Sequence, residues 1–328
     1  MQRYSQVNEV PIALAVFLAH DEYDYNDDPN TISATTLLKP LRQVILASRI
    51  PRTESLVPLA DQMASRLGAA IHSGIENAWL HGREKAMIAM GLPQHVIDNI
   101  VVNPTEEFLD ANPKAIPFYM EQRASKQVGK WKVTGKYDFI GDGMVQDFKS
   151  TGTYSYTKQT GGTKYTQQGS IYRWLDPKKI TDDQMIIHYI FTDWQSMRAK
   201  QDPSYPQRRH IHQYFDLMGI AETDRFVRNK LALIEKYWDA PEEDIPDCDT
   251  EDLWRSEPVW KYFKNPLKTS RSTKNFDNRQ DAYIRMSEDG NVGIITEVPG
   301  RVMACHYCPA FALCTQKDRL VNEGSLTL

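Results

Sequence analysis

Apolar and polar residues alternate along two neighbouring segments near the middle of the chain, residues 131–141 and 144–150. Between them stands Asp142-Gly143, a dipeptide that favours a tight two-residue turn. Side chains that alternate with a period of two lie on opposite faces of a strand. The pattern therefore predicts a β-hairpin in which Gly141 pairs with Met144.

The predicted register has a chemical consequence. Counting outward from the turn, Asp138 pairs with Asp147, and Lys149 lies on the same face as Asp147. Two carboxylates at paired positions have Cβ atoms about 5 Å apart, where like charges are destabilising. A hard divalent cation such as Mg²⁺ binds carboxylate oxygens and would relieve this repulsion. The pattern predicts a metal site on the hairpin, with an ordinary solvated hairpin as the alternative.

Helical periodicity, with apolar residues three or four positions apart, recurs on both sides of the hairpin. Ser33 is a candidate N-cap, Pro40 predicts a kink or two short helices, and Gly82 predicts a break. The helical segments are 33–49, 59–90, 164–175 and 223–238. Further strands are expected to begin at Glu121 and to cover 184–194 and 210–218, with a loop at 151–162. Strands accompanied by helices indicate an α/β fold.

The composition is that of a globular protein, since the 328 residues are 41% hydrophobic and carry a formal net charge of −4. No apolar run reaches the roughly 18 residues that a membrane-spanning helix needs. The apolar residues 10–19 are followed by no cleavage site of a secretory signal peptide. Four cysteines are few for a secreted disulfide scaffold. We therefore expect a cytoplasmic protein without a membrane partner.

Charge is unevenly distributed in the last third of the chain. Residues 239–252 contain eight acidic residues and no lysine or arginine, whereas 255–279 contain seven basic residues against two acids, a local balance of +5. Aromatic residues interleave with the basic ones, which suits a surface that follows a nucleic-acid strand. A solvated loop with aromatic residues in the core explains the pattern equally well. The candidate DNA contacts here are Lys261, Lys264, Lys268 and Arg271.

All four cysteines fit one metal centre. Cys305, Cys308 and Cys314 follow the spacing C-x₂-C-x₅-C, and Cys248 lies far upstream. Four thiolates suit zinc or an iron–sulfur cluster. Zinc sites favour two C-x₂-C pairs, and this chain has one, so we expect a [4Fe–4S] cluster, with Zn²⁺ as the alternative. Either metal would staple residues 248–314 into a closed loop.

Together these motifs resemble the PD-(D/E)XK nucleases. Asp138, followed after eight residues by Asp147-Phe148-Lys149, is similar to the D…(D/E)-x-K core of that superfamily. Gln168 and Tyr172 match the Q-x-x-x-Y element of its RecB-type branch. With its four cysteines, the chain most resembles phage-encoded exonucleases of this branch. In other iron–sulfur nucleases of the group, the lone cysteine precedes the nuclease motifs instead of following them.

The resemblance covers about residues 33–316 and implies a restriction-endonuclease-like mixed sheet flanked by helices, with a cysteine-stapled C-terminal region. It implies three parts, namely an N-terminal helical segment at 1–55, a PD-(D/E)XK nuclease core at 56–238 and an iron–sulfur-stapled region at 239–328.

The resemblance also assigns roles to residues. Mg²⁺ or Mn²⁺ would be bound by His72, Asp138, Asp147 and the carbonyl of Phe148. Lys149 would position the attacking hydroxide, and Glu121 would be a further acid of the catalytic site. The small residues 68–70 would let the helix that carries His72 approach the sheet closely. Gln168 and Tyr172 would belong to the catalytic site and orient the scissile strand, and Lys164 and Tyr165 would contact the DNA.

The function that the resemblance implies is hydrolysis of phosphodiester bonds by a metal-dependent DNA exonuclease in phage recombination or DNA processing, in the host cytoplasm if the chain is phage-encoded. Two alternatives stay open: a structure-selective or nonspecific endonuclease, and a catalytically inactive iron–sulfur DNA-binding module. DNA is the expected partner, and a recombination or single-strand-binding protein would be a second one. The chain contains no P-loop motif, so unwinding would have to come from another protein.

Overall fold

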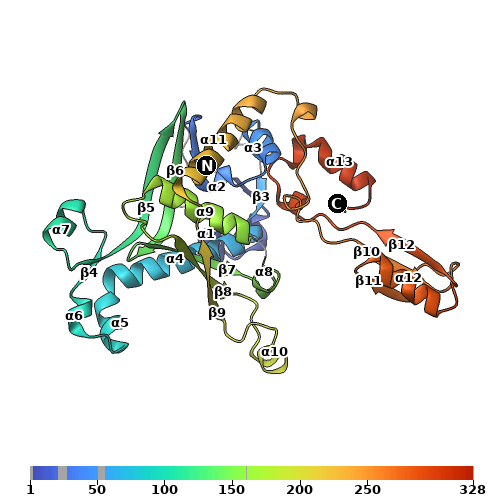
Figure 1. Cartoon of the computed structure of the whole chain (residues 1–328), viewed down its shortest axis with the longest axis horizontal. Helices are drawn as coiled ribbons and strands as arrows, with labels where there is room; N and C mark the ends of the chain where they lie inside the picture. The colour runs from blue at the N-terminus through green and yellow to red at the C-terminus, as the bar shows by residue number, and fades with distance from the viewer. Residues whose placement is uncertain (1–2, 21–27, 51–55, 160, 328) are drawn as a thin grey trace. The chain divides into compact units, whose positions relative to one another are not determined.

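The computed structural model describes residues 3–20, 28–50, 56–159 and 161–327 (Figure 1). The chain divides into two compact units, of which the first comprises Met1–Leu38 and Arg52–Ala232 and the second Lys39–Pro51 and Leu233–Leu328. The boundary expected at residue 55 lies outside the described residues.

The first unit is built on a seven-stranded sheet in the order β4-β5-β6-β7-β8-β9, with β2 pairing β6 beside this path. Its strands are β2 (Thr31–Ser33), β4 (Ile100–Val102), β5 (Ile116–Val128), β6 (Trp131–Gly141), β7 (Met144–Thr151), β8 (Gln184–Phe191) and β9 (His210–Asp216). The pairs β2–β6, β4–β5 and β7–β8 are parallel, and the others are antiparallel. The sheet is therefore mixed, as expected.

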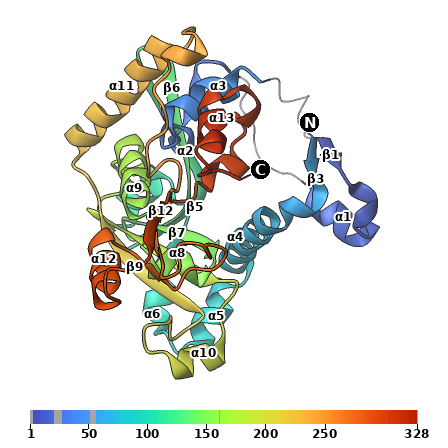
Figure 2. The same cartoon turned by 90° about the vertical axis from the view of Figure 1, so that its right-hand side faces the viewer.

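Helices flank this sheet. They are α1 (Ile12–Ala19), α2 (Ala34–Leu37), α4 (Met63–His81), α5 (Arg83–Ala89), α6 (Gln94–Ile97), α7 (Glu106–Ala111), α8 (Thr153–Thr157), α9 (Gly162–Leu175), α10 (Ser196–Gln201) and α11 (Ile220–Tyr237), which runs across the boundary of the two units. The 3-10 helices η1 (Val7–Glu9) and η2 (Leu59–Gln62) are short. Apart from the sheet, β1 (Arg3–Ser5) and β3 (Leu56–Pro58) pair in parallel beside α1 (Figure 2).

Helices α4 and α9 cover opposite faces of the sheet. On β7, Phe148 contacts His72 of α4, whereas the next residue, Lys149, lies near Tyr165 of α9. Successive residues of a strand point to opposite faces. The two layers of core between the sheet and these helices contain fully buried side chains such as those of Val133, Ile140, Val145 and Ile187.

The second unit contains α3 (Leu41–Ser48), the three-stranded sheet β11-β10-β12 and the C-terminal helix. Its remaining elements are η3 (Glu242–Asp244), β10 (Val259–Phe263), β11 (Lys274–Phe276), α12 (Arg279–Glu288), β12 (Ile294–Val298), η4 (Ala304–Tyr307), η5 (Phe311–Leu313) and α13 (Thr315–Asn322). A small cluster of buried residues, Leu253, Val302, Leu320 and Leu326, packs against Cys248 and Cys305.

Several local predictions are confirmed. Ser33 caps α2, because its hydroxyl accepts a hydrogen bond from the Thr36 amide. The segment around Pro40 forms two short helices, and Gly82 separates α4 from α5. The strand beginning at Gln184 is internal, between β7 and β9. Among the described residues, no helix combines the length and hydropathy that crossing a membrane requires.

Two local predictions are wrong. The segment 151–162 was expected to be a loop, but it contains α8, whose first amide, of Thr153, donates to the Asp193 carboxylate over 2.7 Å. This capping partner lies forty positions later, beyond the reach of local sequence signals. Glu121 was expected to begin a strand, but it lies in the middle of β5.

Candidate functional site

The sheet opens between the two strands of the hairpin. The turn has the predicted register, and backbone pairing runs for three residue pairs before it stops, namely Gly141–Met144, Ile140–Val145 and Phe139–Gln146. Beyond this point β6 stays paired with β5, and β7 stays paired with β8. The predicted pairing of Asp138 with Asp147 is therefore wrong. These two aspartates are the first residues past the last pair, so they flank the opening.

An irregularity at Glu121 explains why the pairing ends there. Glu121 has φ +53°, in the left-handed region that residues other than glycine rarely adopt. Met120 pairs with Phe139 and Gln122 with Tyr137, so Glu121 stands across from Asp138. The ladder on both sides is regular, and the distortion is confined to this one position on each strand.

The distortion makes β6 change faces. Phe139 contacts Trp79 of α4, whereas Tyr137, two residues earlier, contacts Tyr172 of α9. In a regular strand these two side chains would share one face. Because the strand switches between them, Asp138 is directed toward His72 of α4.

His72, Glu121 and Asp138 form a cluster in which ligand atoms of all three residues lie within 4.8 Å of one another. His72 Nδ1 lies 3.4 Å from Asp138 Oδ2, and His72 Nε2 lies 2.9 Å from the carbonyl oxygen of Phe148. The three side chains line a small pocket between α4 and the sheet. One nitrogen donor and two carboxylates within this distance fit a divalent cation.

The hydrogen bond to Phe148 fixes how the His72 ring is used. A carbonyl oxygen can only accept, so Nε2 carries a proton and Nδ1 faces the two carboxylates. Metal-binding histidines typically donate their second N–H to such a carbonyl, which orients the ring. The Phe148 carbonyl, predicted as a metal ligand, is thus engaged at one of its two acceptor positions, and its role as a ligand stays a prediction.

Without a cation, the proton on His72 is held tightly. The hydrogen bond to Asp138 raises the pKa of His72 to about 9, against the opposing effect of burial, and Phe148 and Asp147 add to the rise. At neutral pH the ring is therefore a cation between carboxylates, and a metal ion that binds Nδ1 must displace a proton. The negative charge of Glu121 is compensated by a different cation, Lys136, whose Nζ lies 2.5 Å from the Glu121 carboxylate.

On the α9 side of the opening, Asp147 is buried and pairs with Lys149. Lys149 Nζ lies 2.7 Å from Asp147 Oδ2, and Gln168 Nε2 donates to Asp147 Oδ1 over 3.1 Å. Burial raises the pKa of Asp147, and Asp138 adds to this, while Lys149 opposes it. Burial would lower the pKa of Lys149, but attraction to Asp147 outweighs it, and the net effect is a raised pKa.

The predicted pair Gln168 and Tyr172 lies behind Asp147 and away from solvent. Gln168 is 8% exposed and Tyr172 is 4% exposed, and the amide of Gln168 also donates to the Tyr172 hydroxyl over 2.9 Å. These contacts orient the Asp147 carboxylate. Tyr165 is half-buried near Lys149 and packs on Tyr189 and Phe215, and Lys164 precedes it on the same helix.

His188 of β8 borders this site through its contact with Phe148. Its ring stacks on Phe148, its Nε2 donates to Gln146 Oε1 over 2.9 Å, and its Nδ1 lies 3.2 Å from His210 Nε2. Burial lowers the pKa of His188 to about 4, and His210 and His212 lower it further. It is therefore a neutral ring that stacks on Phe148, while His72 contacts the same ring edge-on.

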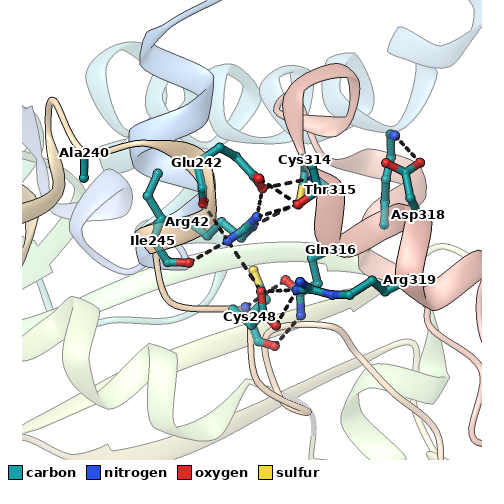
Figure 3. A network of polar contacts seen from close by, with 12 residues as sticks. Arg42, Ala240, Glu242, Ile245, Cys248, Cys314, Thr315, Gln316, Asp318 and Arg319 are labelled. Carbon is teal, nitrogen blue, oxygen red and sulfur yellow. Dashed lines mark hydrogen bonds and ion pairs between the residues drawn. The ribbon is translucent and has the colours of Figure 1, made fainter.

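In the second unit, the lone cysteine is brought to the other three by one glutamine. Gln316 Oε1 accepts a hydrogen bond from the Cys248 amide over 2.9 Å, and Gln316 Nε2 donates to the Cys248 carbonyl over 2.8 Å (Figure 3). Gln316 follows Cys314 by two residues and is 6% exposed. This two-way clamp holds Cys248 beside the C-terminal motif, and sequence analysis did not identify it.

The cysteine thiols affect one another's pKa, with Cys308 and Cys314 acting on both Cys248 and Cys305. Burial raises the pKa of Cys248 to about 12, and Cys314 and Cys308 add to the rise. Burial likewise raises the pKa of Cys305 and of Cys308, each with a contribution from Cys314. Thiolates suit a metal with soft ligands, whose binding would replace the thiol protons. Among the described residues, no three of these sulfur atoms lie within 4.8 Å of one another.

The basic segment 255–279 forms β10, β11 and the loop between them. Tyr262 and Phe263 are buried, so these aromatic residues belong to the local core, as the alternative interpretation held. Lys264 forms an ion pair with Asp289 over 3.2 Å, and Lys261 is half-buried on β10. The predicted contacts Lys268 and Arg271 are exposed in the loop.

No family model matches the chain, and no curated protein matches it. Two solved structures that resemble it are SSO0001 and a phage-related exonuclease from Haemophilus somnus 129PT. The first is 17% identical with a TM-score of 0.39 and covers 68% of this chain and 87% of its own. The second is 15% identical with a TM-score of 0.28 and covers 64% of this chain and 93% of its own. Likenesses at this level establish no common activity. What can be stated of the chain itself is its fold, a mixed α/β structure with a helix-flanked sheet.

Proposed function

We propose that this protein is a metal-dependent DNA nuclease with a PD-(D/E)XK-type site, most consistent with an exonuclease. The observation that carries the proposal is the opening between β6 and β7, where Asp138, Asp147 and Lys149 meet beside the cluster of His72 and Glu121. Two acids and a lysine held at a break in a sheet, with a histidine from a packed helix, form a site suited to phosphodiester hydrolysis.

Mg²⁺ or Mn²⁺ would be held by Asp138, Glu121 and Nδ1 of His72, with Asp147 as a further ligand across the opening. A divalent cation there would supply Lewis-acid stabilisation of the phosphate and acidify a water molecule. The carbonyl of Phe148 keeps the His72 ring in place through the proton on Nε2.

Side chains of the protein would stabilise charge on the phosphate and hold Asp147 in place. Lys149 is held cationic by Asp147, so its Nζ can neutralise the charge that develops on the phosphate oxygens. Gln168 fixes one oxygen of Asp147, which leaves the other for Lys149. Since Gln168 and Tyr172 are buried, we assign them to positioning Asp147 rather than to contact with DNA.

The test uses the full chain with end-labelled linear DNA and covalently closed circular DNA, with Mg²⁺, Mn²⁺ or EDTA. An exonuclease shortens only the linear DNA. Cleavage of the circle would favour the endonuclease alternative, and binding without any cleavage would favour the inactive DNA-binding module.

Substitutions of the two aspartates test whether cleavage depends on this site. Asp138→Asn and Asp147→Asn should each lower metal-dependent cleavage by more than about 100-fold, since even the partners of metal ligands contribute about 10- to 100-fold. Asp216→Asn is the matched control, because Asp216 is an exposed acid on the edge strand β9. Near-normal cleavage by Asp147→Asn would contradict the proposal.

We further propose that Cys248, Cys305, Cys308 and Cys314 bind one [4Fe–4S] cluster with a structural role. The clamp of Gln316 on Cys248 supports this, because it brings the lone cysteine to the others. Iron and acid-labile sulfide in equal amounts, about four each per chain, would support the cluster. One zinc per chain would favour the alternative, Zn²⁺.

A further inference from the structure

A buried arginine far from the cysteines in sequence contacts one of them. Arg42, in the first turn of α3, is 2% exposed. Its Nε donates to Sγ of Cys314 over 3.2 Å, as Figure 3 shows. Both residues belong to the second unit, which residues 39–51 join from the N-terminal part of the chain.

The other nitrogens of the guanidinium group have partners of their own, among them the Asp247 carboxylate, which lies 3.4 Å from Nη1. Arg42 Nη1 donates to the carbonyl of Ile245 over 2.6 Å, and Nη2 forms an ion pair with the Glu242 carboxylate. The same carboxylate accepts hydrogen bonds from the amide and hydroxyl of Thr315, at 3.0 and 2.6 Å. Glu242 therefore ties Arg42 to the residue that follows Cys314, and Nε is left directed at the sulfur.

This arrangement fits a sulfur that carries negative charge. An arginine side chain cannot lose its proton in a protein, and a neutral thiol is a weak hydrogen-bond acceptor. Burying a guanidinium group is costly unless each donor has a good partner. A metal-bound thiolate is such a partner, since hydrogen bonds between ionised groups are shorter and stronger.

We propose that Arg42 is a positioning residue of the four-cysteine metal centre, which donates a hydrogen bond to the ligand sulfur of Cys314 and anchors α3 to the centre. This inference rests on the proposed binding of metal by the cysteines. Partners of metal ligands orient them and tune the metal. A donor to sulfur stabilises the more negative, reduced form of an iron–sulfur cluster, so Arg42 would raise its reduction potential.

The chain supplies a matched control on the same helix. Arg49 follows the last residue of α3, and its Nη2 donates to the carbonyls of Trp238 and Ala240, at 2.9 and 2.8 Å. Like Arg42, it ties α3 to the segment after α11. These partners are backbone carbonyls, and neither lies next to a cysteine in the chain. Arg49→Gln therefore reports what loss of such a tie does by itself.

The experiment uses anaerobically purified full-length protein, with Arg42→Gln, Arg42→Lys and Arg49→Gln as variants. The readouts are metal content, the rate of metal loss to a chelator and, for a cluster, the reduction potential. We expect Arg42→Gln to lose metal about 10- to 100-fold faster and to have a lower reduction potential. Arg42→Lys should be intermediate, because it keeps the charge but not the fork of donors. Arg49→Gln should match the wild type in all three readouts.

A further variant covers the case in which Arg42→Gln is insoluble. Glu242→Gln leaves Arg42 in place but weakens its anchor, so metal loss should again be faster, by a smaller factor. The role of Arg42 would be overturned if soluble Arg42→Gln lost metal at the wild-type rate and kept the wild-type potential. The same result in both Arg42→Lys and Glu242→Gln would also overturn it. Neither result would count against the metal centre itself. A wild-type chain that binds neither iron nor zinc would overturn this inference together with the metal centre, and cleavage of DNA would still test the nuclease site separately.

Discussion

At the scale of single residues, the backbone at Glu121 is the feature that shapes the candidate active site. A residue other than glycine with a left-handed conformation is destabilised by about 1–2 kcal/mol, and such strain often accompanies functional sites. Here it turns β6 so that Asp138 faces His72. The strain is the structural cost of bringing a strand carboxylate to a helix histidine.

Glycine should relieve this strain. We expect Glu121→Gly to be more stable than Glu121→Ala by about 1 kcal/mol, because glycine adopts positive φ freely and alanine does not. Urea denaturation of the two variants would measure the difference. Both variants lose the carboxylate, so both should need more Mg²⁺ for cleavage.

Ser125 provides the control, because it lies exposed on the same strand and in a regular part of the ladder. There the order should be reversed, with Ser125→Ala more stable than Ser125→Gly by about 0.5–1 kcal/mol. If alanine were more stable than glycine at position 121 as well, Glu121 would not be strained.

At the scale of elements, the site depends on how closely α4 approaches the sheet. The prediction that small residues before His72 allow a close approach is confirmed at Gly68, where a Cβ atom would lie 3.1 Å from Ser150 Oγ of β7. Gly68 lies one turn before His72 and on the same side of the helix. The distance between α4 and β7 at Gly68 therefore sets where the imidazole ring stands relative to Asp138.

A larger side chain at this contact should move α4. We expect Gly68→Leu to lower metal-dependent cleavage by about 10- to 100-fold, comparable to the loss of a partner that orients a metal ligand. Gly74→Leu is the control on the same helix, since a Cβ atom there would meet nothing within 4 Å. Equal activity of the two leucine variants would show that the close contact at Gly68 does not position His72.

At the scale of the whole molecule, the two units carry different chemistry. The first unit holds the acids, lysine and histidine of the candidate active site, and the second holds the cysteines and the exposed basic loop. The chain passes between the units three times, because residues 39–51 belong with the C-terminal part. The second unit thus needs an N-terminal helix to complete the surroundings of its cysteines.

The basic loop of the second unit is the candidate DNA contact that the fold leaves most accessible. Changing Lys268 and Arg271 together to glutamine should weaken DNA binding and reduce the slope of log K against log salt by about one unit for each lost phosphate contact. Fluorescence anisotropy with labelled DNA at several salt concentrations would measure it. Lys264→Gln is the comparison, because Lys264 already has an ion pair with Asp289. A slope unchanged in the double variant would mean that the loop is merely solvated.

The sequence by itself determined the features that depend on neighbouring residues. The turn at Asp142-Gly143, the cap at Ser33, the break at Gly82 and the alternation of the strands follow from backbone preferences and from the period of apolar residues. These local rules place Asp147 and Lys149 on one face of β7. They also predict an α/β fold with a mixed sheet once the resemblance of the motifs is added.

Only the tertiary structure decided where distant residues meet. At the face switch of Glu121 and Asp138, Phe139 of β6 packs on α4 and Tyr137 packs on α9, which lies on the other face, and a regular register counted along the sequence could not include this. Arg42 and Gln316 reach the cysteines from positions with no periodic or motif signal. Local pattern fixes which side chains share a face of one element, whereas burial and hydrogen bonding across the chain decide which faces come together.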